Sequence, residues 1–106
     1  MDTDTYVTSS ERHSFLDSTG LVIECDVFNG RKWEFHFENG YGASIIQHDM
    51  SCGHRQGLFE LAVLKKFVRK GWQLCYDTQI SKDVIGCLDD TAVKGYMEKI
   101  RALPAI

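Results

Sequence analysis

Two closely spaced Asn-Gly pairs constrain the fold of this chain more than any other feature of its sequence. Asn29-Gly30 and Asn39-Gly40 tolerate the positive backbone angles that two-residue hairpin turns require. Before, between and after these pairs, apolar and polar residues alternate with a period of two, as they do in half-buried strands. The sequence therefore predicts an antiparallel meander with strands over residues 21–27, 31–38 and 41–48.

The alternation also predicts which side chains of these strands face the core. The expected buried positions of the first two strands are Leu21, Ile23, Cys25, Val27, Trp33, Phe35 and Phe37. In the third strand, Gly42 indicates either a bulge or close packing against a neighbouring ring.

The second half of the chain predicts two more strands and one helix. Residues 58–64 and 72–76 are rich in β-branched and aromatic side chains, which favours two strands over one helix that ends before Gly71. At the C-terminus, apolar residues recur at spacings of three and four after Asp89, a suitable N-cap, and Pro104 ends the pattern. We expect an α+β fold, an antiparallel β-meander of about five strands with a C-terminal helix packed on one face.

Length and composition limit the number of domains. A chain of 106 residues with 43% hydrophobic content forms one domain, which we place at residues 20–106. Residues 1–19 are rich in Asp, Thr and Ser, which predicts a flexible tail. Phe15 and Leu16 are its apolar exceptions, and they are expected to dock either on the core or on a partner.

Charge and cysteine content exclude several classes of protein. A net charge of -3 argues against generic binding to nucleic acid, and the sequence has neither a long apolar run nor a signal peptide. We therefore expect an intracellular protein with no membrane partner. Cys25, Cys52, Cys75 and Cys87 form no Cys-x-x-Cys pair, which favours four free thiols over two disulfides.

Four segments carry a resemblance to a known group of proteins. They are NGYGAS at 39–44, GLFELAVL at 57–64, LCYDT at 74–78 and DVIG at 83–86. Together they resemble a family of small proteins encoded by tailed bacteriophages, over about residues 34–103. The resemblance implies a hairpin around residues 65–71 and a location in the host cell cytoplasm, and it assigns no catalytic residue.

The loop at 49–57 invites two chemical hypotheses. His48, Asp49, Cys52 and His54 are ligand types that suit zinc, although their spacing matches no strong zinc pattern. Cys52 and His54 also resemble a nucleophile and its base, yet nothing nearby forms an oxyanion hole. We expect a polar surface loop, no cofactor and no enzymatic activity, with zinc binding through residues 48–54 as the second alternative.

The predicted function is therefore binding. The resemblance suggests a protein that inhibits or modifies a host protein or defence complex, in the manner of an anti-CRISPR protein, with a homodimer as one possible assembly. The candidate partner-binding residues are Asp49, His54, Arg55, Gln56 and an acidic patch of Glu24, Asp26, Glu34 and Glu38. A first alternative is sequestration of a nucleotide signal, with phosphate held by Lys65, Lys66, Arg69 and Lys70.

Overall fold

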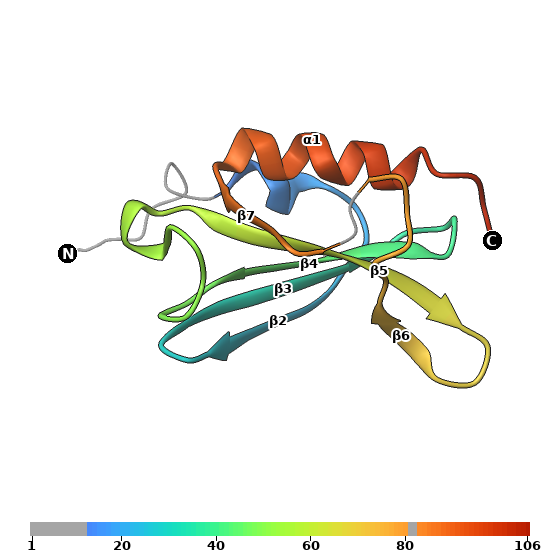
Figure 1. The fold of residues 1–106 in the computed structure, drawn as a ribbon, viewed down its shortest axis with the longest axis horizontal. Helices are drawn as coiled ribbons and strands as arrows, with labels where there is room; N and C mark the ends of the chain where they lie inside the picture. The colour runs from blue at the N-terminus through green and yellow to red at the C-terminus, as the bar shows by residue number, and fades with distance from the viewer. Residues whose placement is uncertain (1–12, 81–82) are drawn as a thin grey trace.

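A computed structural model describes residues 13–80 and 83–106 of the chain. Five antiparallel strands follow one another as a meander, and each pairs with the next along the chain (Figure 1). These strands are β2 (Leu21–Val27), β3 (Gly30–His36), β4 (Tyr41–Gln47), β5 (Phe59–Phe67) and β6 (Gly71–Leu74). The helix α1 (Asp90–Arg101) packs across one face of the sheet, which confirms the predicted α+β fold.

Three shorter elements complete the described part of the chain. The 3-10 turn η2 (Ser14–Asp17) precedes the sheet, and η3 (His54–Gln56) lies in the loop between β4 and β5. The short strand β7 (Ile85–Leu88) pairs with the start of β5, on the same edge where β6 pairs with its end. The sequence did not predict β7, because four residues are too few to establish a periodicity.

The face of the sheet that α1 covers forms the hydrophobic core. The most fully buried side chains are Phe15, Phe35, Ile45, Phe59, Leu61, Val63, Val93, Met97 and Ile100. Each of the three core side chains of α1 contributes roughly 1.5–3 kcal/mol relative to leaving it exposed. A helix of 12 residues is therefore stabilised chiefly by docking on the sheet, as its apolar stripe predicts.

Side chains from outside α1 help to fix both of its ends. At the N-terminus the Asp89 carboxylate accepts a hydrogen bond from the Ala92 amide at 2.7 Å, which confirms the predicted cap. At the C-terminus the Asn39 amide donates to the carbonyls of Ile100 and Leu103 at 2.8 and 3.1 Å. The turn between β3 and β4 thus donates to carbonyls at and just beyond the last turn of the helix, where intrahelical donors run out.

The first hairpin turn lies one residue earlier than the sequence predicted. Val27 pairs with Gly30, so the central residues of the turn are Phe28 and Asn29, with φ of +44° and +64°. Asn29 supplies one of the left-handed positions, but Gly30 is the first residue of β3. Its missing side chain leaves room for the backbone of Gln47, so the glycine serves strand packing instead of the turn.

Strand β2 departs from its predicted alternation. The register with β3 shifts between Leu21, which lies opposite Phe35, and Ile23, which lies opposite Glu34. This irregularity turns Ile23 and Cys25 to the face away from α1, where Ile23 is 40% exposed. The prediction that both residues are buried was therefore wrong, because an unbroken period cannot anticipate a bulge.

The N-terminal segment is placed from His13 onward, and residues 1–12 of the predicted tail lie outside the described residues. Phe15 is fully buried against Trp33 and Phe59, with ring centroids 5.3 and 5.2 Å away. The Asp90 carboxylate accepts hydrogen bonds from the amides of Ser14 and Phe15. Of the two expectations for Phe15, docking on the core is the one that the structure shows.

Candidate interaction surface

The face of the sheet away from α1 is the most distinctive surface of the described protein, and we call it the open face. Within residues 13–80 and 83–106, no helix packs across it. Its centre is a polar row on β3, in which the Glu34 carboxylate lies 3.6 Å from Lys32 Nζ and 2.8 Å from His36 Nε2. The Glu34 side chain is only 13% exposed, so this row belongs to the floor of the surface.

An aromatic stack connects β3 with β6 on the open face. The His36 and Trp72 rings are stacked with centroids 3.8 Å apart, although β4 and β5 separate their strands. Gly42, which pairs with His36, lies beneath the indole, and a Cβ there would approach the Trp72 ring to 3.3 Å. Of the two roles predicted for Gly42, close packing against a ring is the one observed, since the β3–β4 register has no shift.

The open face is hollowed and carries exposed apolar side chains at its borders. Its cavity has a volume of about 390 Å³ and extends from β2 to β6. Phe28, at the first hairpin, is 71% exposed, and Leu74, on β6, is 51% exposed. The cavity is lined by Val27, Phe28, Lys32, Glu34, Ser44, Ile46, His48, Leu64, Trp72, Gln73 and Leu74.

The β5–β6 hairpin continues this surface beyond the sheet. The strand reading of residues 58–76 is confirmed, because Phe67 and Gly71 form the last pair between β5 and β6. Lys66, Arg69 and Lys70 are exposed, and Lys65 is half-buried with its ammonium 5.6 Å from the Phe67 ring centroid. Among the described residues, none of these four cations forms an ion pair with a carboxylate.

The four acidic residues that the sequence grouped as a patch do not lie together. Glu24 and Asp26 both bind the Arg31 guanidinium, at 2.6 Å each. Their register with β3 places them on the face of the sheet opposite to Glu34. Glu38 lies in the turn after β3, beside another cavity. The predicted patch was therefore wrong as a single surface, because the bulge in β2 reverses the face that its charges occupy.

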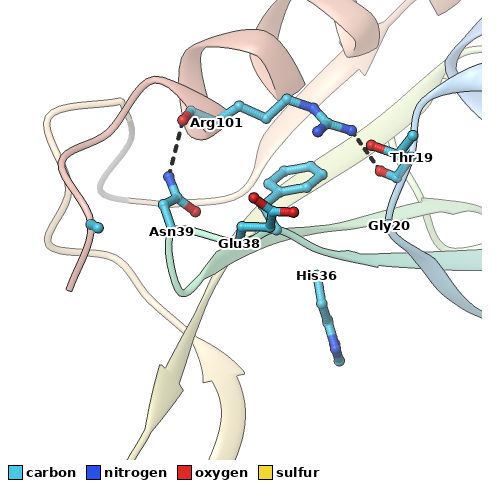
Figure 2. Close-up of a pocket in the computed structure, with 8 residues that line it drawn as sticks. Thr19, Gly20, His36, Glu38, Asn39 and Arg101 are labelled. Atoms are coloured by element: carbon cyan, nitrogen blue, oxygen red, sulfur yellow. Dashed lines mark hydrogen bonds between the residues drawn. The ribbon is translucent and has the colours of Figure 1, made fainter.

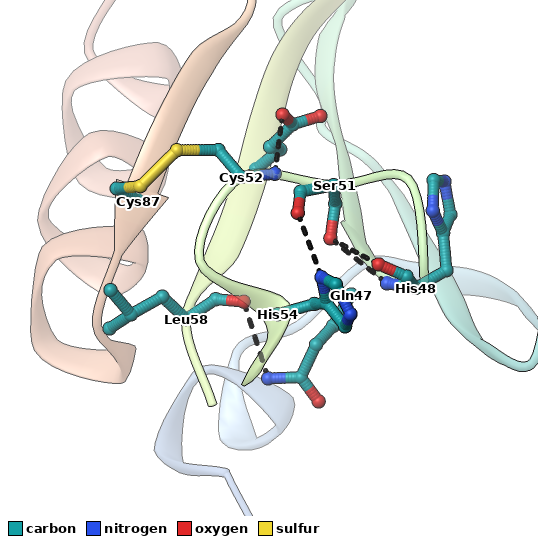
Figure 3. The surroundings of a disulfide bond; sticks show 8 residues. Gln47, His48, Ser51, Cys52, His54, Leu58 and Cys87 are labelled. Carbon is teal, nitrogen blue, oxygen red and sulfur yellow. Dashed lines mark hydrogen bonds between the residues drawn. A yellow bond between two sulfur atoms is a disulfide. The ribbon is translucent and has the colours of Figure 1, made fainter. Parts of the chain in front are cut away.

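The loop between β4 and β5 is tied to β7 by a disulfide between Cys52 and Cys87 (Figure 3). The expectation of four free thiols was therefore wrong for these two residues, while Cys25 and Cys75 are free. The sequence could not reveal the bridge, since its cysteines are separated by 35 positions that include all of β5 and β6. Gly86 leaves space for it, because a Cβ there would lie 2.9 Å from Cys52 Cβ.

The same bridge removes the basis of the zinc hypothesis. Cys52 has no thiolate to offer a metal while it is bonded to Cys87. His54 Nδ1 lies 3.2 Å from the Ser51 carbonyl, and its Nε2 lies 3.9 Å from the Asp49 carboxylate. Within the described residues, no group of three potential ligands could hold a metal ion. Arg55 and Gln56 are exposed on η3, as a binding loop requires.

A second cavity, of about 610 Å³, lies near the C-terminal end of α1 (Figure 2). Arg101 borders it, with its guanidinium 4.2 Å from the Phe37 ring centroid and one N–H donated to the Thr19 carbonyl at 2.5 Å. Asn39 borders it as well and is already engaged with α1. These side chains hold the helix, the N-terminal segment and the sheet together, so we assign this cavity a structural role.

The remaining free thiols do not form a reactive centre. Burial raises the pKa of Cys75, and its thiol also donates a hydrogen bond to the Asp77 carboxylate, 2.9 Å away. A raised pKa keeps the group protonated at neutral pH, where the thiolate is the nucleophile. Cys25 is exposed on the edge strand β2.

Comparisons with known proteins give no relative of this chain: no family model, curated protein or solved structure matches it. Within the described residues, no helix is long and apolar enough to cross a membrane. The sequence predicted neither the hollow of the open face nor its apolar borders, although Glu34 and the cations of the hairpin were among the candidate site residues. Leu74 and Trp72 could have been assigned to that face from the register of β6 with β5, but a register is not visible in one sequence.

Proposed function

We propose that this protein is a small binding protein that docks on a partner protein through its open face. The observation that carries the proposal is the cavity of about 390 Å³, bordered by Phe28 and Leu74, on a sheet face that α1 leaves uncovered. Exposed apolar side chains that gather around a hollow are typical of protein interaction sites.

The chemistry of this surface favours a partner segment with apolar side chains and an acidic border. The floor supplies the apolar side chains of Ile46, Leu64 and Trp72, which are suited to receive an anchor residue. The polar row of Lys32, Glu34 and His36 is internally paired and adds little attraction of its own. Arg69 and Lys70, in the turn between β5 and β6, border a cavity with Leu74, where they can attract carboxylates of the partner and speed association.

The bacteriophage resemblance suggests what such a partner is. A protein of this kind would inhibit or modify a host protein or defence complex by occupying its surface, which requires no active site. The Cys52–Cys87 bridge favours an oxidising compartment, whereas the resemblance implies the host cytoplasm. Alkylation of thiols at the moment of cell lysis distinguishes the two, because a cytoplasmic protein would present both cysteines as thiols.

The experiment compares the proteins that co-purify with tagged variants expressed in the host. Phe28→Asn keeps the left-handed turn, since Asn tolerates positive φ, and it removes an apolar border. Leu74→Asp places a charge at the opposite border, and Val84→Asp is the matched control, at a 38% exposed residue that does not line the cavity. We expect one partner to be retained by the control and lost from both face variants.

The result that contradicts the proposal is equally specific. If all three variants recover the same proteins in the same amounts, the open face is not the binding site. If the protein is recovered alone and phage plating on defended hosts is unchanged by its expression, the proposed inhibition of a host system is wrong as well.

A further inference from the structure

The tip of the β5–β6 hairpin has a composition that the fold does not need. Between Phe67, which ends β5, and Gly71, which begins β6, the chain turns through Val68, Arg69 and Lys70. Figure 1 shows this hairpin extending beyond the part of the sheet that α1 covers. Side chains at its tip therefore contribute little to the core, and their chemistry reflects another constraint.

The cations of the hairpin differ from Arg31 and Arg101. Arg31 is held by two carboxylates, and Arg101 is held by the Thr19 carbonyl and the Phe37 ring. By contrast, Lys66, Arg69 and Lys70 form no ion pair with a carboxylate among the described residues, while the hydrogen bond from Cys75 and the charge of Lys65 both lower the pKa of Asp77. Three positive charges that are not ion-paired within residues 13–80 and 83–106, with Lys65 beside them, produce a local field that attracts an anionic surface.

The apolar residues at the tip narrow the class of that surface. Val68 is 102% exposed and Phe67 is 38% exposed, so the hairpin presents a bare aliphatic side chain next to its cations. Phosphates of a nucleic acid would engage the cations but offer nothing to Val68. A lipid surface accommodates both, because headgroups attract Lys and Arg while apolar side chains enter the boundary with the acyl chains.

We propose that the β5–β6 hairpin docks peripherally on an anionic lipid surface. The exposed Lys66, Arg69 and Lys70 meet the headgroups, Lys65 adds to the positive field, and Val68 with Phe67 enters the interface. This revises the expectation of no membrane partner, which rested on the lack of a long apolar run, because peripheral docking needs only a small exposed site.

The overall charge of the protein limits this contact to the hairpin. The chain carries -3 in total, so with four cations in the hairpin the rest carries -7 (-3 minus +4). A lipid surface of the same sign repels the rest of the protein, but charges farther than about 8 Å from it are largely screened at physiological salt. A projecting hairpin therefore suits weak, salt-sensitive attachment.

The test measures sedimentation of the purified full chain with vesicles of phosphatidylcholine alone and of phosphatidylcholine mixed with phosphatidylglycerol. We expect binding to the mixed vesicles only, and weaker binding as salt is raised. Lys70→Gln should weaken binding about five-fold, the effect of one cation near an anionic surface. Lys94→Gln is the control, because it makes the same change of charge on an exposed position of α1 and should leave binding unchanged.

Val68→Ser distinguishes a membrane from other anionic partners. Since Val68 is fully exposed, this change should leave the melting temperature unaltered and weaken vesicle binding several-fold. The proposal is overturned if mixed vesicles are not bound at low salt, or if Val68→Ser binds them as well as the wild type. It is also overturned if an oligonucleotide or inorganic phosphate binds the hairpin while the vesicles do not. Val68 neither lines the open face nor belongs to its basic border, so the outcome for Val68→Ser can overturn this proposal while the docking of a partner protein stands.

Discussion

Removing the Cys52–Cys87 bridge is the most informative perturbation of stability. The two cysteines are 35 residues apart, and a cross-link over that separation restricts the unfolded chain by about 13 cal/mol/K. At room temperature this corresponds to about 4 kcal/mol of stability. For a chain of 106 residues, with an unfolding entropy of about 2.1 cal/mol/K per residue, we expect the melting temperature to fall by about 15–20 °C.

The assay is denaturant unfolding of the wild type with and without dithiothreitol, beside the double variant Cys52→Ser/Cys87→Ser. Reduced wild type and double variant should unfold at the same lower denaturant concentration, and the reductant should leave the double variant unchanged. Cys25→Ser is the matched control, because it removes a free, exposed thiol and should behave as the wild type in both conditions.

The reasoning is refuted if reduction changes the free energy of unfolding by less than about 1 kcal/mol, well below the range typical of native bridges. It is refuted more directly if the native, oxidised protein yields four alkylated cysteines after denaturation, since only Cys25 and Cys75 are free in the structure.

Three further predictions concern how the N-terminal segment and the helix are held. Phe15→Ala should lower the free energy of unfolding by about 3–5 kcal/mol in a denaturant titration, because Phe15 is fully buried. A loss no larger than that caused by an alanine substitution at an exposed residue contradicts the docking of Phe15 on the core. Asn39→Asp keeps the acceptor for the Tyr41 amide but loses the donor to α1, and it should cost about 1–3 kcal/mol; an unchanged stability refutes the capping role. Burial lowers the pKa of His13 below 6.5, and this effect exceeds that of the Asp90 charge, which raises the pKa. The His13 imidazole therefore binds a proton more readily in the unfolded chain than in the folded protein. The contribution of His13 to the free energy of unfolding should be complete above pH 6.5 and should be lost as the pH falls from 6.5 through the lowered pKa. His13→Phe should remove this part of the pH dependence of stability, and a variant with the same pH profile as the wild type contradicts the prediction.

Much of the fold was predictable because its determinants are local. A hairpin turn needs residues that tolerate positive φ, a strand needs alternation, and a helix needs an N-cap and an apolar stripe. Asp89 and the C-terminal helix were therefore identified from neighbouring residues alone. The turn at Asn39-Gly40 lies where it was predicted, but only Gly40 has a positive φ, of 88°, so it is not the two-residue turn that the sequence predicted. The one-residue error at Asn29 arose because Gly30 was needed by a contact with Gln47, on a strand that lies later in the chain.

The surfaces were less predictable, because a surface depends on which residues the register brings to one face. A single shift in β2 separated Glu24 and Asp26 from Glu34 and divided the predicted acidic patch. The cations of the hairpin at 65–70 were identified correctly as a charged group, since they are consecutive in sequence. That they lie unpaired beside a hollow apolar face became visible only in three dimensions.

The meander and the C-terminal helix follow from the sequence, since turn geometry and side-chain periodicity act over a few residues. The tertiary structure alone decided the pairing of Cys52 with Cys87, the capping of α1 by Asn39, the burial of Phe15 and the hollow of the open face. Each of these joins residues far apart in the chain, and such contacts form only when the whole core closes. Asn29 and Gly40, one residue from each Asn-Gly pair, take the left-handed conformations at which the chain turns, and long-range packing defines what it presents to a partner.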